Sequence, residues 1–352
     1  MGEEYYDWHK TLAYDADVTM VIGARGLGKT FGLRRQFVRD YLNNGYRFVE
    51  IVRYKDELAD VSQDYFERIS ELDEFEGIRF KADSHNAYLA RNDINEKPKW
   101  EMIGYFIAMT QHQRKKKKTY DHVRRLLLDE AIIERTDRYH KYLPNEFMIL
   151  GDIVDTVSRE RPGVKGTRPR VYLLGNACDI ANPYFMHYGV GTNLKFGYRW
   201  YSNKTFLLHY VESASYSSAK ARDTVAGRMI SGSDWGRQSI DNTFVLESTE
   251  FVHEKPKRAR FRFGVICNGM GFGVWVDESD GYYYVTNSIP RNSDRRVFTL
   301  TRSDDTANYI AIRRASPVLK NFAELWYMGV VRFDTVSCKE RFYQVLDLFG
   351  IR

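Results

Sequence analysis

The sequence of 352 residues has few cysteines and no long apolar run. Cys178, Cys267 and Cys338 lie far apart and form no Cys-x-x-Cys pair, so neither a disulfide scaffold nor a zinc ribbon is expected. No stretch approaches the roughly 18 apolar residues of a membrane span. The acidic start, MGEEYYDWHK, matches neither a signal peptide nor a transit peptide. We therefore expect a reduced, intracellular protein that has no membrane partner.

The sequence also has little excess of one charge sign over the other. Lys and Arg number 53 against 47 Asp and Glu, which gives a formal net charge of +6. This excess is too small for a histone-like protein, but it suits an anionic partner if the basic residues are clustered. The length is enough for two domains of average size.

The first half of the chain alternates strand-like and helix-like segments, which favours an α/β fold with a mainly parallel sheet. Strands are predicted at Val18–Ile22, Arg47–Arg53, Arg124–Asp129 and Arg170–Gly175, and helices from Phe31 to Gly45 and from Phe147 to about Arg159.

After about residue 200 the pattern changes. A Ser- and Ala-rich stretch and a glycine-bearing stretch predict a small linker. Three alternating runs then predict a meander of strands at Arg260–Cys267, Gly273–Val276 and Tyr282–Thr286, and two helices follow. The predicted boundaries are 1–200 for the α/β domain, 201–238 for the linker and 239–352 for an α+β domain.

One segment fits the phosphate-binding pattern GxxxxGK[ST] at every fixed position and lies between a predicted strand and a predicted helix. Its glycines let backbone N–H groups curl around phosphate oxygens, and the helix N-terminus favours an anion. Lys29 can reach the β- and γ-phosphates, which makes it a candidate catalytic residue too, and Thr30 can ligate Mg²⁺. The predicted nucleotide-binding residues are Gly23, Ala24, Arg25, Gly26, Leu27, Gly28, Lys29 and Thr30.

The expected companion of this loop is Leu126-Leu127-Leu128-Asp129-Glu130. A buried strand would deliver Asp129 to Mg²⁺, and Glu130 could polarise the attacking water. A kinase would not need the second carboxylate, whereas an ATPase does. The sequence therefore predicts ATP hydrolysis with ATP and Mg²⁺ bound.

Three further groups are candidates for the same site. Asn176 ends a predicted strand, where it is either a sensor of the γ-phosphate or a turn residue. Arg53, with Tyr54 and Lys55, either faces the nucleotide or lies in a solvated loop. Arg159 follows a predicted helix, where it is either an arginine finger or a charge that complements the helix dipole.

Basic stretches are candidates for contact with a nucleic-acid backbone, although such runs also occur on solvated surfaces. The first consists of Arg114, Lys115, Lys116, Lys117 and Lys118, and the second of Arg258, Arg260 and Arg262. The second set is predicted to share one strand face, opposite Phe261 and Phe263. The long strand at Arg260–Cys267 carries no acidic residue, so nuclease activity is not expected.

Together these residues resemble the genome-packaging motor ATPases of small, protein-primed tailed bacteriophages, the phi29-type family. The resemblance runs through nearly the whole chain. It is carried by VIGARGLGKT, VRYKDEL, LLLDE, YLPNE, DTVSRER, GNA with NPYF, SIDN, GFGVWVD and VRFD.

The resemblance implies an additional-strand, conserved-glutamate (ASCE) P-loop ATPase domain. The linker would join it to an RNase H-like, vestigial nuclease domain that contacts DNA or the portal. It makes Gly23–Thr30 the Walker A loop, Asp129 the Walker B aspartate, Glu130 the catalytic glutamate and Arg159 a trans-acting arginine finger. It also implies a homopentameric ring in the host cytoplasm, transiently at the capsid portal, which drives double-stranded DNA into a prohead. Some relatives use a packaging RNA, and the sequence does not show whether this chain does.

The leading hypothesis is thus an ATP-driven double-stranded DNA translocase. Another P-loop nucleic-acid motor, such as a helicase, is the first alternative. A non-catalytic, ATP-dependent DNA-binding protein at the portal is the second.

Overall fold

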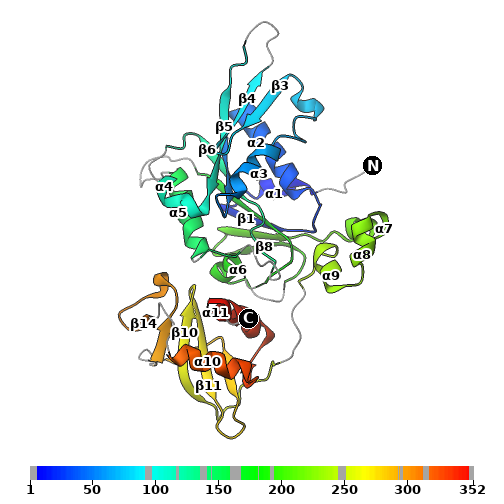
Figure 1. The fold of residues 1–352 in the computed structure, drawn as a ribbon. Coiled ribbons are helices and arrows are strands. Elements are labelled where there is room, and N and C mark those ends of the chain that lie inside the picture. The colour runs from blue at the N-terminus through cyan, green and yellow to red at the C-terminus, as the bar shows by residue number, and fades with distance from the viewer. Residues whose placement is uncertain are drawn as a thin grey trace. The chain divides into compact units, whose positions relative to one another are not determined.

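The computed structural model describes residues 6–91, 97–115, 119–134, 141–143, 145–158, 168–180, 182–190, 194–244, 251–291, 293, 296–311 and 317–348. The chain forms two compact units (Figure 1). The first unit comprises Met1–Asp179 and Leu194–Phe244, and the second comprises Ile180–Asn193 and Val245–Arg352. Among the described residues, no helix combines the length and apolar character needed to cross a membrane.

The first unit is built on a nine-stranded sheet of order β3-β4-β5-β2-β6-β7-β1-β9-β8. Its six central strands, from β5 to β9, are parallel, which confirms the predicted mainly parallel α/β sheet. The outer pairs are antiparallel and were not predicted. The strands are β1 (Val18–Ile22), β2 (Arg47–Val52), β3 (Ile78–Ala82), β4 (Asn86–Arg91), β5 (Glu101–Ala108), β6 (Val123–Leu128), β7 (Arg170–Gly175), β8 (Gly197–Tyr201) and β9 (Phe206–Tyr210).

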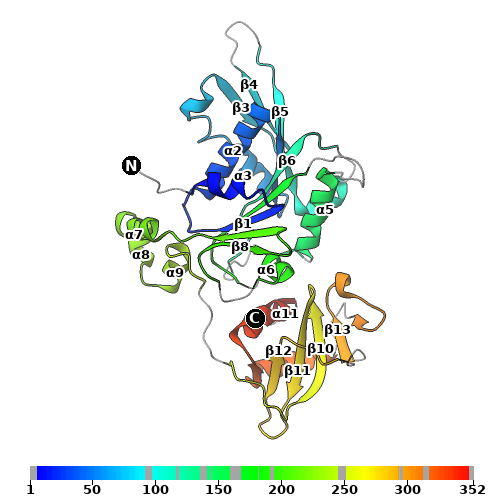
Figure 2. The same cartoon turned by 180° about the vertical axis from the view of Figure 1, so that it is seen from behind.

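Helices cover both faces of this sheet, with α1, α2 and α3 on one face and α4 and α5 on the other (Figures 1 and 2). Leu33, Phe37 and Val38 of α2 pack into a core with Phe48 and Leu127 of the sheet, and all five are fully buried. The helices are α1 (Trp8–Ala13), α2 (Lys29–Asn44), α3 (Glu57–Asp64), α4 (His112–Lys115) and α5 (Glu146–Ser158), with 3-10 turns η1 (Asp73–Phe75) and η2 (Met109–Gln111).

The ends of α2 follow directly from its glycines. Gly28 adopts a left-handed conformation with φ of 77°, so the helix begins at Lys29, two residues before the predicted start. Gly45 ends the helix as predicted, with φ of 70° and an N–H that donates to Tyr41 O at 2.8 Å. Both positions require a backbone conformation that favours glycine.

The segment predicted as a linker contains three short helices, α7 (Ala214–Asp223), α8 (Val225–Ile230) and α9 (Asp234–Ser239). They follow β9, which is part of the nine-stranded sheet. The domain boundaries at 200 and 238 remain predictions.

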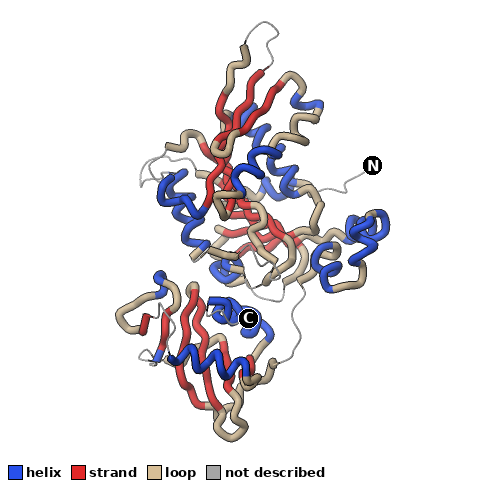
Figure 3. Tube along the Cα trace, viewed as in Figure 1, coloured by secondary structure: helices blue, strands red, loops and turns tan. Residues whose placement is uncertain are grey.

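The second unit is built on a six-stranded sheet of order β14-β13-β10-β11-β12-β15. The antiparallel meander β10-β11-β12 was predicted, whereas β13, β14 and β15 were not. Helix α10 crosses this sheet (Figure 3), and its Phe322 contacts Phe263 of β10 and Phe342 of α11. The elements are α6 (Pro183–Tyr188), β10 (Arg260–Cys267), β11 (Met270–Val276), β12 (Tyr283–Thr286), β13 (Val297–Thr299), η4 (Arg302–Asp304), β14 (Ile310–Ala311), α10 (Pro317–Tyr327), β15 (Val331–Phe333) and α11 (Val336–Leu348).

Candidate nucleotide-binding site

The loop at residues 23–28 joins the carboxyl end of β1 to α2. Gly26, with φ of 88°, and Gly28 are both left-handed, so the chain turns sharply before the helix begins. Gly23, Ala24 and Leu27 are buried, whereas Arg25 and Gly26 are exposed. The loop therefore has the strand–turn–helix context that a phosphate-binding loop needs.

Lys29 points back into this loop and is only 7% exposed. Its Nζ donates to Gly23 O at 2.7 Å, to Ala24 O at 2.9 Å and to Asn176 Oδ1 at 3.2 Å. Burial lowers the pKa of Lys29 to about 8, although Asp129 acts in the opposite direction. A buried ammonium held mainly by neutral oxygens is suited to binding an anion, because a phosphate would supply the missing negative charge.

Thr30 and Asp129 meet beside the loop. Thr30 lies in the first turn of α2, Asp129 directly follows β6, and Thr30 Oγ1 donates to Asp129 Oδ2 at 2.7 Å. One hydroxyl and one carboxylate oxygen at this separation are the donor types that Mg²⁺ prefers. These two residues fit the predicted metal site.

Glu130 follows Asp129 in a left-handed conformation with φ of 49°. Its N–H donates to Asp129 Oδ1 at 2.9 Å, and its carbonyl accepts from Arg53 Nη1 at 2.7 Å. Partial burial of the carboxylate, together with the Asp129 charge, raises the pKa of Glu130. A non-glycine residue held at positive φ is a strained position of the kind that clusters at active sites.

Arg53 lies behind this turn as part of a buried ion pair. It is 5% exposed, and its Nε donates to Glu146 Oε1 and Oε2 at 3.1 and 3.0 Å. Its Nη2 also donates to Ala131 O at 2.8 Å, and its guanidinium lies 5.4 Å from the Tyr142 ring centroid. The solvated-loop alternative is thus wrong for Arg53, which holds the backbone on which Glu130 is carried. Glu146 was not identified as a site residue, because no local pattern links it to Arg53.

The remaining predicted site residues are distributed as follows. Asn176 is brought to Lys29, and its role as a γ-phosphate sensor remains a prediction. Arg159 and Lys116–Lys118 lie outside the described residues. Arg114 is exposed on α4, whose last residue is Lys115.

The predicted basic face in the second unit needs one correction. Arg260 and Arg262 are exposed on β10, opposite the partly buried Phe261 and Phe263, as predicted. Arg258 does not belong to β10, which begins at Arg260, because it lies in a turn in which Ala259 N donates to Pro256 O at 3.0 Å. Arg258 Nε donates instead to Asp277 Oδ2 at 2.6 Å, and Arg262 pairs with Glu278 at 3.2 Å.

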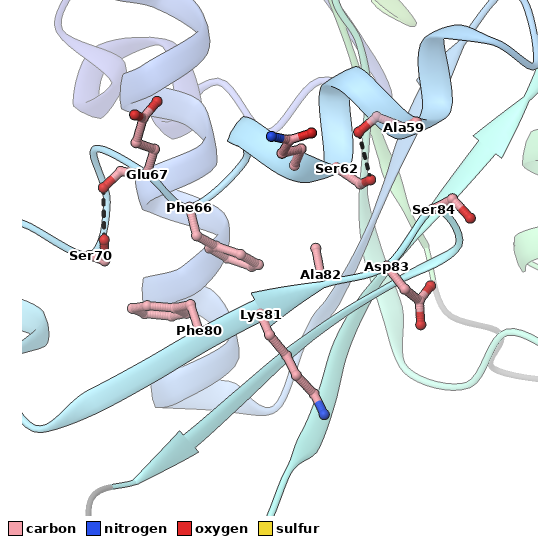
Figure 4. Close-up of a pocket in the computed structure, with 11 residues that line it drawn as sticks. Ala59, Ser62, Phe66, Glu67, Ser70, Phe80, Lys81, Ala82, Asp83 and Ser84 are labelled. Carbon is pink, nitrogen blue, oxygen red and sulfur yellow. Dashed lines mark hydrogen bonds between the residues drawn. The ribbon is translucent and has the colours of Figure 1, made fainter.

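A cavity of about 560 Å³ lies elsewhere in the first unit, between α3 with the turns after it and the hairpin of β3 and β4 (Figure 4). The rings of Phe66 and Phe80 stack there with centroids 4.8 Å apart. None of its lining residues belongs to the loop at residues 23–28, to Asp129 or to Glu130. The cavity is therefore separate from the candidate site.

The chain is similar to known proteins in both sequence and structure. A protein-family model described as podovirus DNA encapsidation protein (Gp16) matches residues 2–349. The DNA packaging proteins of Bacillus phages phi29 and B103 are each 30% identical to this chain, covering 99% and 97% of it and 98% and 100% of their own lengths. The solved bacteriophage phi29 viral genome packaging motor assembly contains a chain of 29% identity. It matches with a TM-score of 0.68 over 98% of this chain and 99% of that one.

Proposed function

This chain belongs to the podovirus DNA encapsidation protein (Gp16) family, and from that membership and the site geometry we propose that it is an ATP-driven double-stranded DNA translocase. It would package a viral genome into a preformed prohead. The observation that carries the proposal is the hydrogen bond between Thr30 and Asp129. It joins the end of the phosphate loop to the carboxylate that follows β6, as binding of a metal–nucleotide complex requires.

In this proposal the loop at residues 23–28 binds the ATP phosphates through its backbone N–H groups. Lys29 leaves the carbonyls of Gly23 and Ala24 and donates to the β- and γ-phosphates. Thr30 and Asp129 would hold Mg²⁺, which would neutralise charge on the phosphates. The cost of burying the Lys29 ammonium is offset when the anion arrives.

Glu130 would polarise the attacking water. Its raised pKa makes it a better proton acceptor than an ordinary surface carboxylate. The two hydrogen bonds from Arg53 to the carbonyls of Glu130 and Ala131 fix the turn that carries it. Arg159 of a neighbouring subunit would stabilise the charge on the γ-phosphate, which makes turnover depend on assembly.

For the partners we propose double-stranded DNA, a homopentameric ring and the capsid portal. Some relatives also use a packaging RNA. The basic stretches are the residues proposed to contact nucleic acid. Arg114, Arg258, Arg260 and Arg262 are the exposed arginines from those stretches that the structure describes, and Arg258 is paired with Asp277. Their charges suit contact with phosphates irrespective of base sequence.

For the second unit we propose an RNase H-like fold without nuclease activity. Strands β12, β11 and β10 are antiparallel, and β13 and β14 continue in parallel beyond β10. This order supports the RNase H-like assignment. The central strand β10 carries no carboxylate, so it lacks a metal ligand of the kind that two-metal nucleases need.

The proposal is tested with Glu130→Gln. This variant should bind ATP with nearly unchanged affinity and hydrolyse it roughly 100-fold more slowly, because the general base is removed while the loop remains. Hydrolysis is measured against protein concentration, with and without double-stranded DNA. Glu76→Gln, at an exposed glutamate near η1, is the matched control. Normal turnover by Glu130→Gln would refute the assignment, and DNA-independent turnover by the native protein would refute the translocase.

A further inference from the structure

Helix α7 contacts the phosphate loop. Tyr216 Oη donates to Arg25 O at 3.2 Å, and Lys220 Nζ donates to the same carbonyl at 2.5 Å. Tyr216 is 191 positions and Lys220 is 195 positions from Arg25 along the chain. One carbonyl of the loop is therefore held by two side chains of a helix that no motif singled out.

The fit between α7 and the loop is close. A Cβ added to Gly26 would lie 2.5 Å from Tyr216 Oη, which is too close for any real contact. Tyr216 also packs against the apolar core of the first unit. The ring of Tyr216 therefore has little freedom to move away from the loop.

The segment that carries α7 is fixed at both ends to β1, next to the loop. At its start, Val211 N donates to Ile22 O at 2.8 Å. At its end, the buried Asn242 donates through Nδ2 to Ile22 O at 3.1 Å and to Val211 O at 3.0 Å. Ser217 on α7 donates to Ile240 O at 2.6 Å, which links the helix to the end of the same segment. These bonds place α7 at a fixed position relative to residue 23.

Lys220 is suited to hold a carbonyl firmly. It is half-buried, and besides Arg25 O its Nζ donates to Ser239 O at 3.2 Å. Burial and the nearby Arg25 side chain lower the pKa of Lys220. Hydrogen bonds from a charged donor are about twice as strong as those from a neutral one.

The orientation of the Arg25 carbonyl determines where the Gly26 N–H points. The peptide group is planar and trans, so the carbonyl of Arg25 and the N–H of Gly26 point in opposite directions. With the carbonyl directed to α7, the Gly26 N–H is directed to the opposite side of the peptide, away from α7. We propose that Tyr216 and Lys220 are positioning residues that fix the Arg25–Gly26 peptide so that the Gly26 N–H is presented to a nucleotide phosphate.

This inference rests on the proposed function, and the experiment separates the two. Binding of a fluorescent ATP analogue with Mg²⁺ is measured for the full chain and its variants, alongside their melting temperatures without nucleotide. Lys220→Met should weaken binding about tenfold and Tyr216→Phe about threefold, the sizes expected for losing a charged and a neutral hydrogen bond. Lys220→Arg should restore binding to within about threefold of the native protein.

Arg222→Met is the matched control, because Arg222 is an exposed basic residue on the same helix that pairs with Asp223. It should leave affinity unchanged. A purely structural role would lower the melting temperature of Lys220→Met without changing its affinity, and that result would overturn the inference while the proposed function stands. Failure of the native protein to bind nucleotide would overturn both.

Discussion

The Thr30 hydroxyl donates a 2.7 Å hydrogen bond to the Asp129 carboxylate, although 99 positions separate the two residues. The parallel pairing of β1 with β7 and of β7 with β6 explains this approach. The carboxyl ends of β1 and β6 lie at one edge of the sheet, and α2 starts from that edge. Two distant sequence motifs thereby form one site.

Replacing Asp129 by Asn should lower ATP hydrolysis roughly 100-fold, because the charge of the proposed metal ligand is lost. Hydrolysis measured against Mg²⁺ concentration should show that part of the activity returns at high Mg²⁺. Asp60→Asn, on the exposed face of α3, is the control and should behave as the native protein. A Mg²⁺ dependence shared by both variants would contradict the metal site.

Lys29 should make the stability of the nucleotide-free protein depend on pH. Burial lowers its pKa from the ordinary value of 10.5 to about 8 in the folded protein. The unfolded chain therefore binds more protons between these values, and the free energy of unfolding rises with pH across this window.

We expect a gain of about 2 kcal/mol for this group between pH 7 and pH 9.5, which Lys29→Met should lack. The comparison is made by urea unfolding of both proteins at each pH, because other groups that titrate in this range cancel in the difference. If the free energy of unfolding depended on pH equally in both proteins, burial would not lower the pKa of Lys29, and the prediction would be wrong.

Breaking the buried pair of Arg53 and Glu146 should be strongly destabilising. Glu146→Leu leaves the guanidinium without its carboxylate partner, which costs about 3–5 kcal/mol at such sites. The double variant Arg53→Met with Glu146→Leu should recover much of the melting temperature, since no charge remains buried.

Hydrolysis should stay low in that double variant, because the carbonyls of Glu130 and Ala131 lose their donors. Thermal unfolding and turnover are measured on the same preparations. Recovery of both properties together would show that Arg53 serves stability alone.

Arg260→Gln should weaken binding to double-stranded DNA and reduce its salt dependence by about one ion. Arg258→Gln should have a smaller effect, because Arg258 is paired with Asp277. No ion pair involves Arg260 within the part of the chain that the structure describes. Binding isotherms at several salt concentrations test the difference, and equal effects of the two variants would argue against it.

The site residues that the sequence identified lie within short motifs, and the spacing of residues within each motif indicates the site. The glycines and Lys29 of the loop must be contiguous to turn the backbone around an anion, and an apolar strand must immediately precede Asp129. The mainly parallel sheet followed from the alternation of strands and helices. Its antiparallel edges did not. The strand β3 alternates partly buried and exposed residues, but such alternation does not show which strand lies beside it or in which direction.

The groups that support the loop come together only through the packing of the fold. Asn176 was a candidate at the end of a strand, but its contact with Lys29 depends on the pairing of β1 with β7. The pairing of Arg53 with Glu146 and the approach of Tyr216 to Arg25 have no signal in local spacing. A hydrogen bond between distant residues depends on how sheets and helices pack. The sequence therefore determined the chemistry of this site, and packing determined how that chemistry is held in place.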